Sequence, residues 1–329
     1  MALERAGGGR VSIVIPALNE ERVIGQCLQA LTRLDFPRDS FEVVLVDNGS
    51  TDRTVEIARS FSPALNLTVL PRPGARISAM RNFGVSKTSG EILAFLDADC
   101  LAPPQWLRTA TRLLAQEGLG VLGAHYKVPE DSSWVGRAWF GGMELEKQGD
   151  IAWVPAGDMI LARSTFERIG GFDESIQTNE DCELCERARA AGLRVVGDAA
   201  VAVVHLGTPQ TLGHFYRKIR WHATDGLRVF LRSLPRITNP WPLLFASYTA
   251  FCAAGTALGL AAAAWSGTFA PLALFSAALL APALLLSLRR VAKSGKWADL
   301  GTLTVLHLAF GLARGHALLR AAGRVRGDR

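Results

Sequence analysis

Residues 90–100 read GEILAFLDADC, an apolar run that ends in two closely spaced carboxylates. The first part of this run is typical of a buried strand. Asp97 and Asp99 follow where that strand should end. Because burying charge is costly, carboxylates in such a place usually have a charged partner or an ion. The stretch therefore predicts a strand that leads directly into a polar site.

Strands and helices alternate on both sides of this stretch. Apolar runs predict strands at residues 11–16, 41–47, 67–71 and 201–205, and helical spacing predicts helices at 23–34, about 50–60, 75–86, from 104 onward and at 182–191. This alternation indicates an α/β fold with a Rossmann-like, mostly parallel and helix-covered sheet. Ligands of such sheets bind beyond the carboxyl ends of the strands. Asn19, Glu20, Asp47 and the two aspartates fall at those ends, so we expect one polar rim.

The sequence lacks the Gly-rich phosphate-binding loops of dinucleotide-binding enzymes and of P-loop enzymes. No GxGxxG follows the first strand, and no GxxxxGK[ST] occurs anywhere. Asp97 and Asp99 are two residues apart, so in extended chain both point the same way. Such oxygen ligands suit Mg²⁺ or Mn²⁺, which keep positions free for phosphate oxygens. A lone D-x-D is also common as a solvated acidic turn, and the pattern by itself leaves both interpretations open.

Two uncharged stretches dominate the C-terminal part of the chain, which has 329 residues and is 49% hydrophobic. Residues 243–265 and 268–288 are each long enough to cross a bilayer as a helix, and Ser266-Gly267 joins them as a hairpin. The alternative is a pair of buried helices in a soluble domain. A third apolar segment, residues 300–319, is interrupted by two histidines and an arginine. It either crosses the membrane or lies in the interface.

Basic residues flank the predicted hairpin on both sides. They are Arg217, Lys218, Arg220, Arg228, Arg232 and Arg236 before it, and Arg289, Arg290, Lys293 and Lys296 after it. Both flanks are therefore expected on the cytoplasmic side. The N-terminus has no apolar core, so no cleaved signal peptide is expected. The net charge of +6 is concentrated near the membrane, which favours attraction to a lipid surface over nucleic-acid binding.

Five blocks of sequence, in order, resemble glycosyltransferase family 2 across about residues 10–225. They are SIVIPALNEERVIGQCLQAL (12–31), VVLVDNGSTDRT (43–54), GARISAMRNFGVSKTSGEILAFLDADC (74–100), PAGDMILARSTFERIGGFDES (155–175) and NEDCELCERARAAG (179–192). The resemblance implies a GT-A fold, a nucleotide-diphosphate sugar donor and inversion of the anomeric centre. It also implies a divalent metal, Mn²⁺ or Mg²⁺.

The resemblance implies a role for each matching residue on the donor side. The residues expected to bind the donor nucleotide are Pro16, Asn19, Glu20, Asp47, Arg76, Arg81 and Asp97. Asp47 is expected to pair with the base, and Asp97 to lie near the ribose or the metal. Asp99 is expected to be the direct metal ligand. His205 is either a further ligand or a structural histidine at the end of its strand.

The resemblance also implies which residues act on the acceptor. Glu180 and Asp181 match the acidic pair that supplies the catalytic base, and they open a predicted helix whose dipole favours an ionised carboxylate. An ionised carboxylate takes the proton of an acceptor hydroxyl. If the acceptor is an anionic phosphate, no base is needed and Asp181 only positions it. Gly157 and Asp158 are expected to line the acceptor side.

The expected protein is a hexosyltransferase with a catalytic domain at residues 1–235 and a membrane region at residues 236–329. It would move one sugar from a UDP- or GDP-sugar to a lipid-linked or membrane-bound acceptor at the cytoplasmic face of the inner membrane, as a multi-pass protein. Arg217 stands where processive synthases have Gln in Q-x-x-R-W, so we expect a non-processive enzyme. Two alternatives are a sugar nucleotidyltransferase and a non-catalytic membrane-anchored binder of sugar nucleotides.

Overall fold

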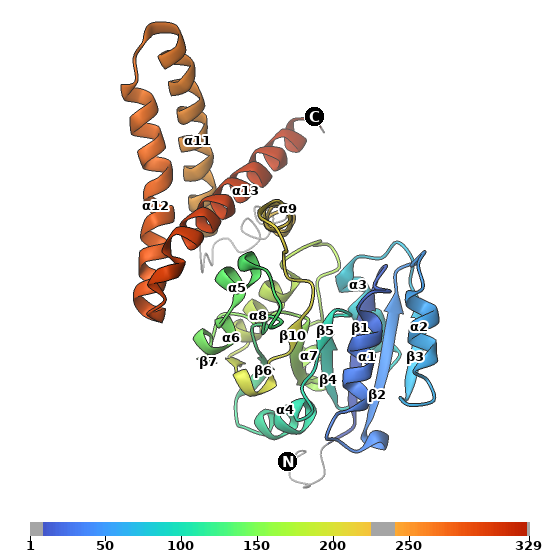
Figure 1. Cartoon of the computed structure of the whole chain (residues 1–329). Coiled ribbons are helices and arrows are strands. Elements are labelled where there is room, and N and C mark those ends of the chain that lie inside the picture. Colours follow the sequence, from blue (N-terminus) through green and yellow to red (C-terminus); the bar gives the residue numbers. More distant parts are fainter. Residues whose placement is uncertain (1–8, 225–240, 328–329) are drawn as a thin grey trace. The chain divides into compact units, whose positions relative to one another are not determined.

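The computed structural model describes residues 9–224 and 241–327 of the chain. These residues belong to two compact units: one combines residues 1–131 with 140–208, and the other combines residues 132–139 with 209–329. The expected boundary between residues 235 and 236 lies outside the described residues, as do Arg228, Arg232 and Arg236 of the basic flank. Figure 1 shows the chain coloured from the N-terminus to the C-terminus.

The first unit is built on an eight-stranded sheet in the order β3-β2-β1-β4-β8-β6-β9-β7. Its strands are β1 (Val11–Ala17), β2 (Phe41–Asp47), β3 (Leu67–Pro71), β4 (Ile92–Leu96), β6 (Leu119–Gly123), β7 (Gly149–Asp150), β8 (Asp158–Ala162) and β9 (Arg194–Gly197). The four N-terminal strands run parallel, while β8 is antiparallel to both of its neighbours and β7 is antiparallel to β9. The prediction of a mostly parallel α/β sheet is confirmed.

Helices cover both faces of this sheet (Figure 1). The helices of this unit are α1 (Ile24–Thr32), α2 (Thr54–Ser60), α3 (Ile77–Ser86), α4 (Trp106–Leu114), α6 (Met143–Glu146), α7 (Arg163–Arg168) and α8 (Glu180–Ala190). Alternate side chains of β1 enter opposite cores, because successive residues of a strand point to opposite faces. Ile13 and Ile15 pack in the cluster that contains Leu28 of α1, while Val14 packs in the cluster that contains Leu184 of α8.

A small second sheet joins two segments that are distant in the sequence. Strand β5 (Cys100–Leu101) pairs antiparallel with β10 (Val204–His205), so that His205 lies opposite Cys100. The predicted strand at residues 201–205 is therefore too long. Residues Ala199–Val201 form a 3₁₀ turn, because the side chain of Asp198 accepts a hydrogen bond from the backbone N–H of Ala200 and caps it.

The second unit contains α5 (Trp134–Phe140), α9 (Leu212–His222), α11 (Trp241–Ser266), α12 (Ala270–Ser294) and α13 (Leu300–Gly327). Among the described residues, three helices are long and apolar enough to cross a membrane: Leu243–Ser266, Ala270–Ser294 and Trp297–Arg320. The helices predicted at 243–265, 268–288 and 300–319 are thus present. Gly267, with a φ of 70° that favours glycine, lies in the turn between α11 and α12.

Candidate active site

The ends of β1 and β2 are tied together by the residues expected to face the nucleoside. Asn19, in a left-handed conformation with φ 57°, accepts the backbone N–H of Thr51 on its side-chain oxygen at 2.9 Å. The carboxylate of Asp47 accepts the backbone N–H groups of Gly49 and Ser50 at 3.0 and 3.1 Å. These bonds fix the loop after β2 against the end of β1, at the rim where the sequence predicts the donor.

Glu20 adds a further carboxylate to this rim. Its backbone N–H donates to Thr54 Oγ1 at 2.7 Å, which fixes the residue at the start of the segment leading into α1. Burial, followed by the negative charges of Asp99, Asp97 and Asp52, raises the pKa of Glu20 to about 7. The repulsion shows that these carboxylates share one negative region. Such a region attracts a divalent cation.

Asp97 is held by protein groups on both of its carboxylate oxygens. Oδ1 accepts from Arg81 Nη2 at 2.7 Å, and Oδ2 accepts from the hydroxyl of Tyr126 at 3.4 Å. The backbone N–H of Asp97 donates to Gly157 O at 3.4 Å. A side chain on Gly157 would place Cβ 2.2 Å from Asp97 Oδ2, so only glycine fits without moving the carboxylate. The residues at the end of β4 are therefore fixed before any ligand binds.

Arg81 bridges two carboxylates of the site. Its side chain is only 2% exposed, and its Nη1 donates to Glu180 Oε1 at 2.7 Å while its Nη2 donates to Asp97. The guanidinium therefore connects the first aspartate of D-x-D to the acidic pair at the start of α8. Both contacts are with carboxylates, because a buried cation is stable only beside opposite charge. Arg76 also contacts protein, since its Nη1 donates to Ser175 O at 2.6 Å.

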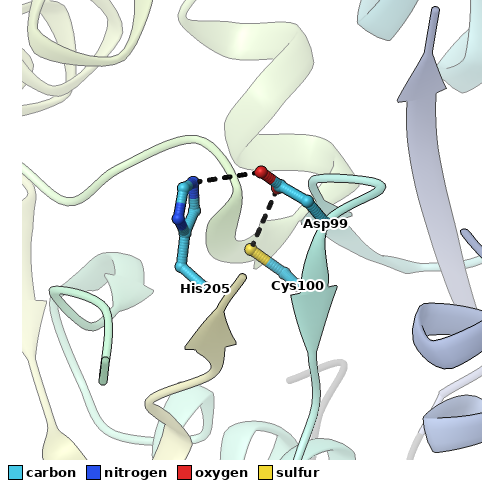
Figure 2. A group of neighbouring side chains, drawn as sticks. All are labelled: Asp99, Cys100 and His205. Carbon is cyan, nitrogen blue, oxygen red and sulfur yellow. Dashed lines mark hydrogen bonds and ion pairs between the residues drawn. The ribbon is translucent and has the colours of Figure 1, made fainter. Parts of the chain in front are cut away.

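Asp99 and His205 form the part of the rim that is suited to a metal (Figure 2). Asp99 Oδ2 lies 3.4 Å from His205 Nε2, and the ligand atoms of Asp99, Cys100 and His205 all lie within 4.8 Å of one another. The ring of Tyr126 stacks on that of His205, with centroids 4.6 Å apart. A Cβ on Gly207 would lie 2.1 Å from Asp99 Oδ2, so this glycine leaves room for the carboxylate.

The chemistry of these donors decides which of them fit a hard divalent ion. Burial, followed by the charges of Asp99 and Asp97, raises the pKa of the Cys100 thiol well above its ordinary value. Cys100 is therefore a neutral thiol, which is a poor ligand for Mg²⁺ or Mn²⁺. The carboxylate of Asp99 and the imidazole of His205 are suitable ligands, and imidazole together with carboxylate favours Mn²⁺ over Mg²⁺.

The acidic pair at the N-terminus of α8 divides into two different roles. Glu180 is the ion-pair partner of Arg81, whereas the carboxylate of Asp181 is hydrogen-bonded by Cys182, whose backbone N–H donates to Asp181 Oδ1 at 2.7 Å. Burial, followed by the charge of Glu180, raises the pKa of Asp181 to about 7. A carboxylate with a pKa near neutrality is a suitable general base. The geometry therefore favours Asp181 over Glu180 for that task.

Asp158 faces the protein interior and not the acceptor side. Its side chain is fully buried, and it accepts from Trp106 Nε1 at 3.0 Å and from the backbone N–H of Val203 at 3.4 Å. Burial raises its pKa well above the ordinary value. Asp158 therefore braces the segment that leads to His205. The expectation that it contacts an acceptor does not agree with this position.

The chain matches the profile described as "Glycosyl transferase family 2" over residues 12–170, and the one described as "Glycosyl transferase family group 2" over residues 92–288. The second match covers more than half of the chain. This chain belongs to glycosyltransferase family 2.

Two curated relatives illustrate the range of this family. Glycosyltransferase AglE of Haloferax volcanii is 34% identical over 190 residues, which cover 55% of this chain and 62% of that protein. The beta-monoglucosyldiacylglycerol synthase of Synechocystis is 27% identical over 238 residues, which cover 68% of this chain and 49% of that protein. The chain therefore spans less than two thirds of the length of either relative.

A solved structure supports the GT-A fold of this family 2 chain. The mannosyltransferase PcManGT from Pyrobaculum calidifontis, in complex with GDP-Man and Mn²⁺, aligns with a TM-score of 0.63 and 23% identity, covering 96% of this chain and 88% of that one. At this identity the likeness concerns the fold.

Two residues of the site, Tyr126 and Gly207, were not expected from the sequence. Tyr126 touches both Asp97 and His205, and Gly207 lies against Asp99. A signal for Tyr126 was present, because the apolar run LGVLG at residues 119–123 predicts a further strand, and Tyr126 follows its end. No comparable signal marks Gly207.

Proposed function

We propose that this chain is an inverting, metal-dependent glycosyltransferase that moves one sugar from a nucleotide-diphosphate sugar to a membrane-associated acceptor. The observation that carries the proposal is the combination of Asp99 and His205 with a separate carboxylate, Asp181, whose pKa is about 7. Asp99 and His205 are suited to hold, through a metal ion, the leaving diphosphate, and Asp181 is suited to activate the acceptor.

On the donor side, the nucleoside binds against the loops that follow β1 and β2. Asn19 and Asp47 hold these loops in position by accepting hydrogen bonds from the backbone of the loop after β2. Asp99 and His205 would hold Mn²⁺ or Mg²⁺, and a bound ion supplies positive charge that stabilises the departing diphosphate. Arg81 and Tyr126 keep Asp97 in position beside this site.

On the acceptor side, Asp181 removes the proton of an acceptor hydroxyl as its oxygen attacks the anomeric carbon. Attack from the face opposite the diphosphate inverts that carbon, and the proton ends on the carboxylate of Asp181. Glu180 remains paired with Arg81 and stabilises the ionised guanidinium. If the acceptor is a phosphate, which is already anionic, Asp181 positions it and takes no proton.

The membrane helices supply the argument for a membrane-bound acceptor. Helices α11 and α12 are long and apolar enough to cross a bilayer, and the basic residues on both flanks favour a cytoplasmic catalytic unit at the inner membrane. The name of one relative, beta-monoglucosyldiacylglycerol synthase, refers to a glycolipid. We therefore propose transfer at the cytoplasmic face. With three candidate membrane helices among the described residues and Arg217 in place of Gln, we propose a single transfer for each acceptor.

A thermal-shift screen of the detergent-purified chain tests the donor and the metal together. We expect one UDP- or GDP-sugar to raise the melting temperature in Mn²⁺ by several degrees more than in EDTA, because a ligand that binds only the folded state stabilises it. Free UDP and GDP serve as references for the nucleotide part. A panel in which no sugar nucleotide stabilises the chain, with or without metal, would contradict the proposal.

A further inference from the structure

The polar residues that interrupt the third apolar helix have partners within the same unit. His307 Nδ1 lies 2.8 Å from Ser287 Oγ of α12, and His316 Nδ1 lies 3.1 Å from the hydroxyl of Tyr216 on α9. Arg314 lies over the ring of a neighbouring phenylalanine of α13, 5.2 Å from its centroid. The two histidines therefore attach α13 to two other helices, the apolar helix α12 and the amphipathic helix α9.

Helix α13 contacts the α11–α12 hairpin near the end that is opposite the turn. A Cβ on Gly311 would lie 2.9 Å from Thr249 Oγ1, and a Cβ on Gly315 would lie 3.1 Å from Ala246 O. Both partners belong to the first turns of α11, and Ser287 belongs to the last turns of α12. Figure 1 shows α13 crossing the hairpin obliquely at this end. The contacts therefore lie near the cytoplasmic boundary of the proposed spans.

Amphipathic helices cover another side of α13. The buried cluster formed there consists of Val135 from α5, Phe215 and Ile219 from α9, and Leu306, Ala309 and Ala313 from α13. The outer side of α9 carries Arg217 and Trp221, which are four residues apart and both exposed, Trp221 to 48%. Residues four apart lie on the same side of a helix. Helix α9, which packs beside the middle of α13, therefore exposes the Arg217 guanidinium and the Trp221 ring on one side.

This packing conflicts with a third membrane crossing. If the candidate span Trp297–Arg320 crossed the bilayer, its middle would lie at the bilayer centre. Helix α9 would lie at the same depth, and Arg217 would be surrounded by hydrocarbon. Charged side chains at that depth are rare, and they face a protein interior or a water-filled cavity, whereas this one is exposed. The conflict disappears if α13 lies at the level of the headgroups.

We infer that α13 lies along the membrane surface and does not cross it, and that α9 presents its Arg217–Trp221 side to lipid headgroups. Tryptophan favours the headgroup level, and arginine is attracted to the anionic lipids of the cytoplasmic leaflet. Arg320 and the basic residues after it then remain on the same side as α9, in agreement with the charge rule. The inference rests on the proposal that α11 and α12 cross the membrane.

Reporter fusions to the full chain in a bacterial host test the topology. Alkaline phosphatase inserted at Gly267 is expected to be active, whereas phosphatase fused after Arg329 is expected to be inactive and GFP fused there to be fluorescent. An active phosphatase after Arg329 together with an active one at Gly267 would overturn the inference and leave the hairpin intact. An inactive phosphatase at Gly267 would overturn the hairpin, and the inference with it.

Fluorescence quenching tests the contact of α9 with headgroups. The full chain and its Trp221→Phe variant are placed in vesicles of phosphatidylglycerol and phosphatidylcholine, and the emission lost in the variant is assigned to Trp221. We expect a quencher on the lipid headgroup to reduce this emission at least twofold more than a quencher at the end of the acyl chain. Stronger quenching from the chain end, or no quenching by either lipid, would overturn the inference.

Discussion

Gly207 offers a way to move the proposed metal ligand without removing it. In a Gly207→Ala variant, the new Cβ would lie 2.1 Å from Asp99 Oδ2 and 2.9 Å from His205 Cε1. Carbon and oxygen approach one another to only about 3.3–3.6 Å. The carboxylate must therefore move by about 1 Å or more. Both neighbours are the ends of side chains and not backbone, so the fold can accommodate the methyl group by rotating them.

The expected effect falls on metal binding and turnover more than on stability. Displacing the partner of a metal ligand typically costs about 10- to 100-fold in metal affinity or activity, and a misplacement of about 1 Å costs about 100-fold in rate. Overpacking of this size costs about 1–3 kcal/mol of unfolding free energy. We therefore expect the Mn²⁺ concentration at half-maximal activity to rise about 10- to 100-fold while the protein remains folded.

Release of nucleoside diphosphate, measured across a Mn²⁺ titration, is the assay. Gly25→Ala is the matched control, because its Cβ would meet only Ile57 Cγ2 at an ordinary 3.5 Å. That variant is expected to keep the wild-type Mn²⁺ dependence and to gain up to about 1 kcal/mol from better helix propensity. An unchanged Mn²⁺ dependence in Gly207→Ala would refute the assignment of Asp99 and His205 to the metal.

Three further predictions concern the other parts of the site. Asp181→Asn should abolish transfer to a hydroxyl acceptor but keep metal-dependent donor binding. In the wild type, the rate of transfer should rise with pH and level off above about 7, because only the ionised carboxylate of Asp181 accepts a proton. A pH–rate profile measures this dependence. Arg81→Met leaves the buried Glu180 and the partly buried Asp97 without their cation and should reduce the free energy of unfolding by about 3–5 kcal/mol in a denaturant titration. Trp106→Phe removes the indole donor to Asp158 and should destabilise the protein by about 1–3 kcal/mol, measured in the same way.

The N-terminal half of the sheet was predictable because its signals are local. Each parallel strand is a short apolar run followed by its own helix, and the carboxyl ends of such strands meet at one edge. The position of Asp97 and Asp99 follows from this rule alone. The order of β8, β6, β9 and β7 was not predictable, because these strands pair out of chain order and two of them run antiparallel to their neighbours.

The parts of the site that the sequence could not give depend on contacts between distant residues. His205 reaches Asp99 because β10 pairs with β5, more than 100 residues earlier in the chain. Arg81 reaches Glu180 across 99 positions, and nothing in either local pattern indicates a buried ion pair. Hydropathy alone could not decide the place of α13 either, because its histidines look unfavourable until Ser287 and Tyr216 are found beside them.

The central claim is that Asp99 holds a divalent ion which carries the donor diphosphate. Isothermal titration of the donor selected by the thermal-shift screen, into wild type and Asp99→Asn with and without Mn²⁺, tests it most directly. The account predicts Mn²⁺-dependent binding to wild type and a loss of that dependence, with affinity at least 10-fold weaker in Mn²⁺, in the variant. Equal donor affinity and equal Mn²⁺ dependence in the two proteins would contradict it.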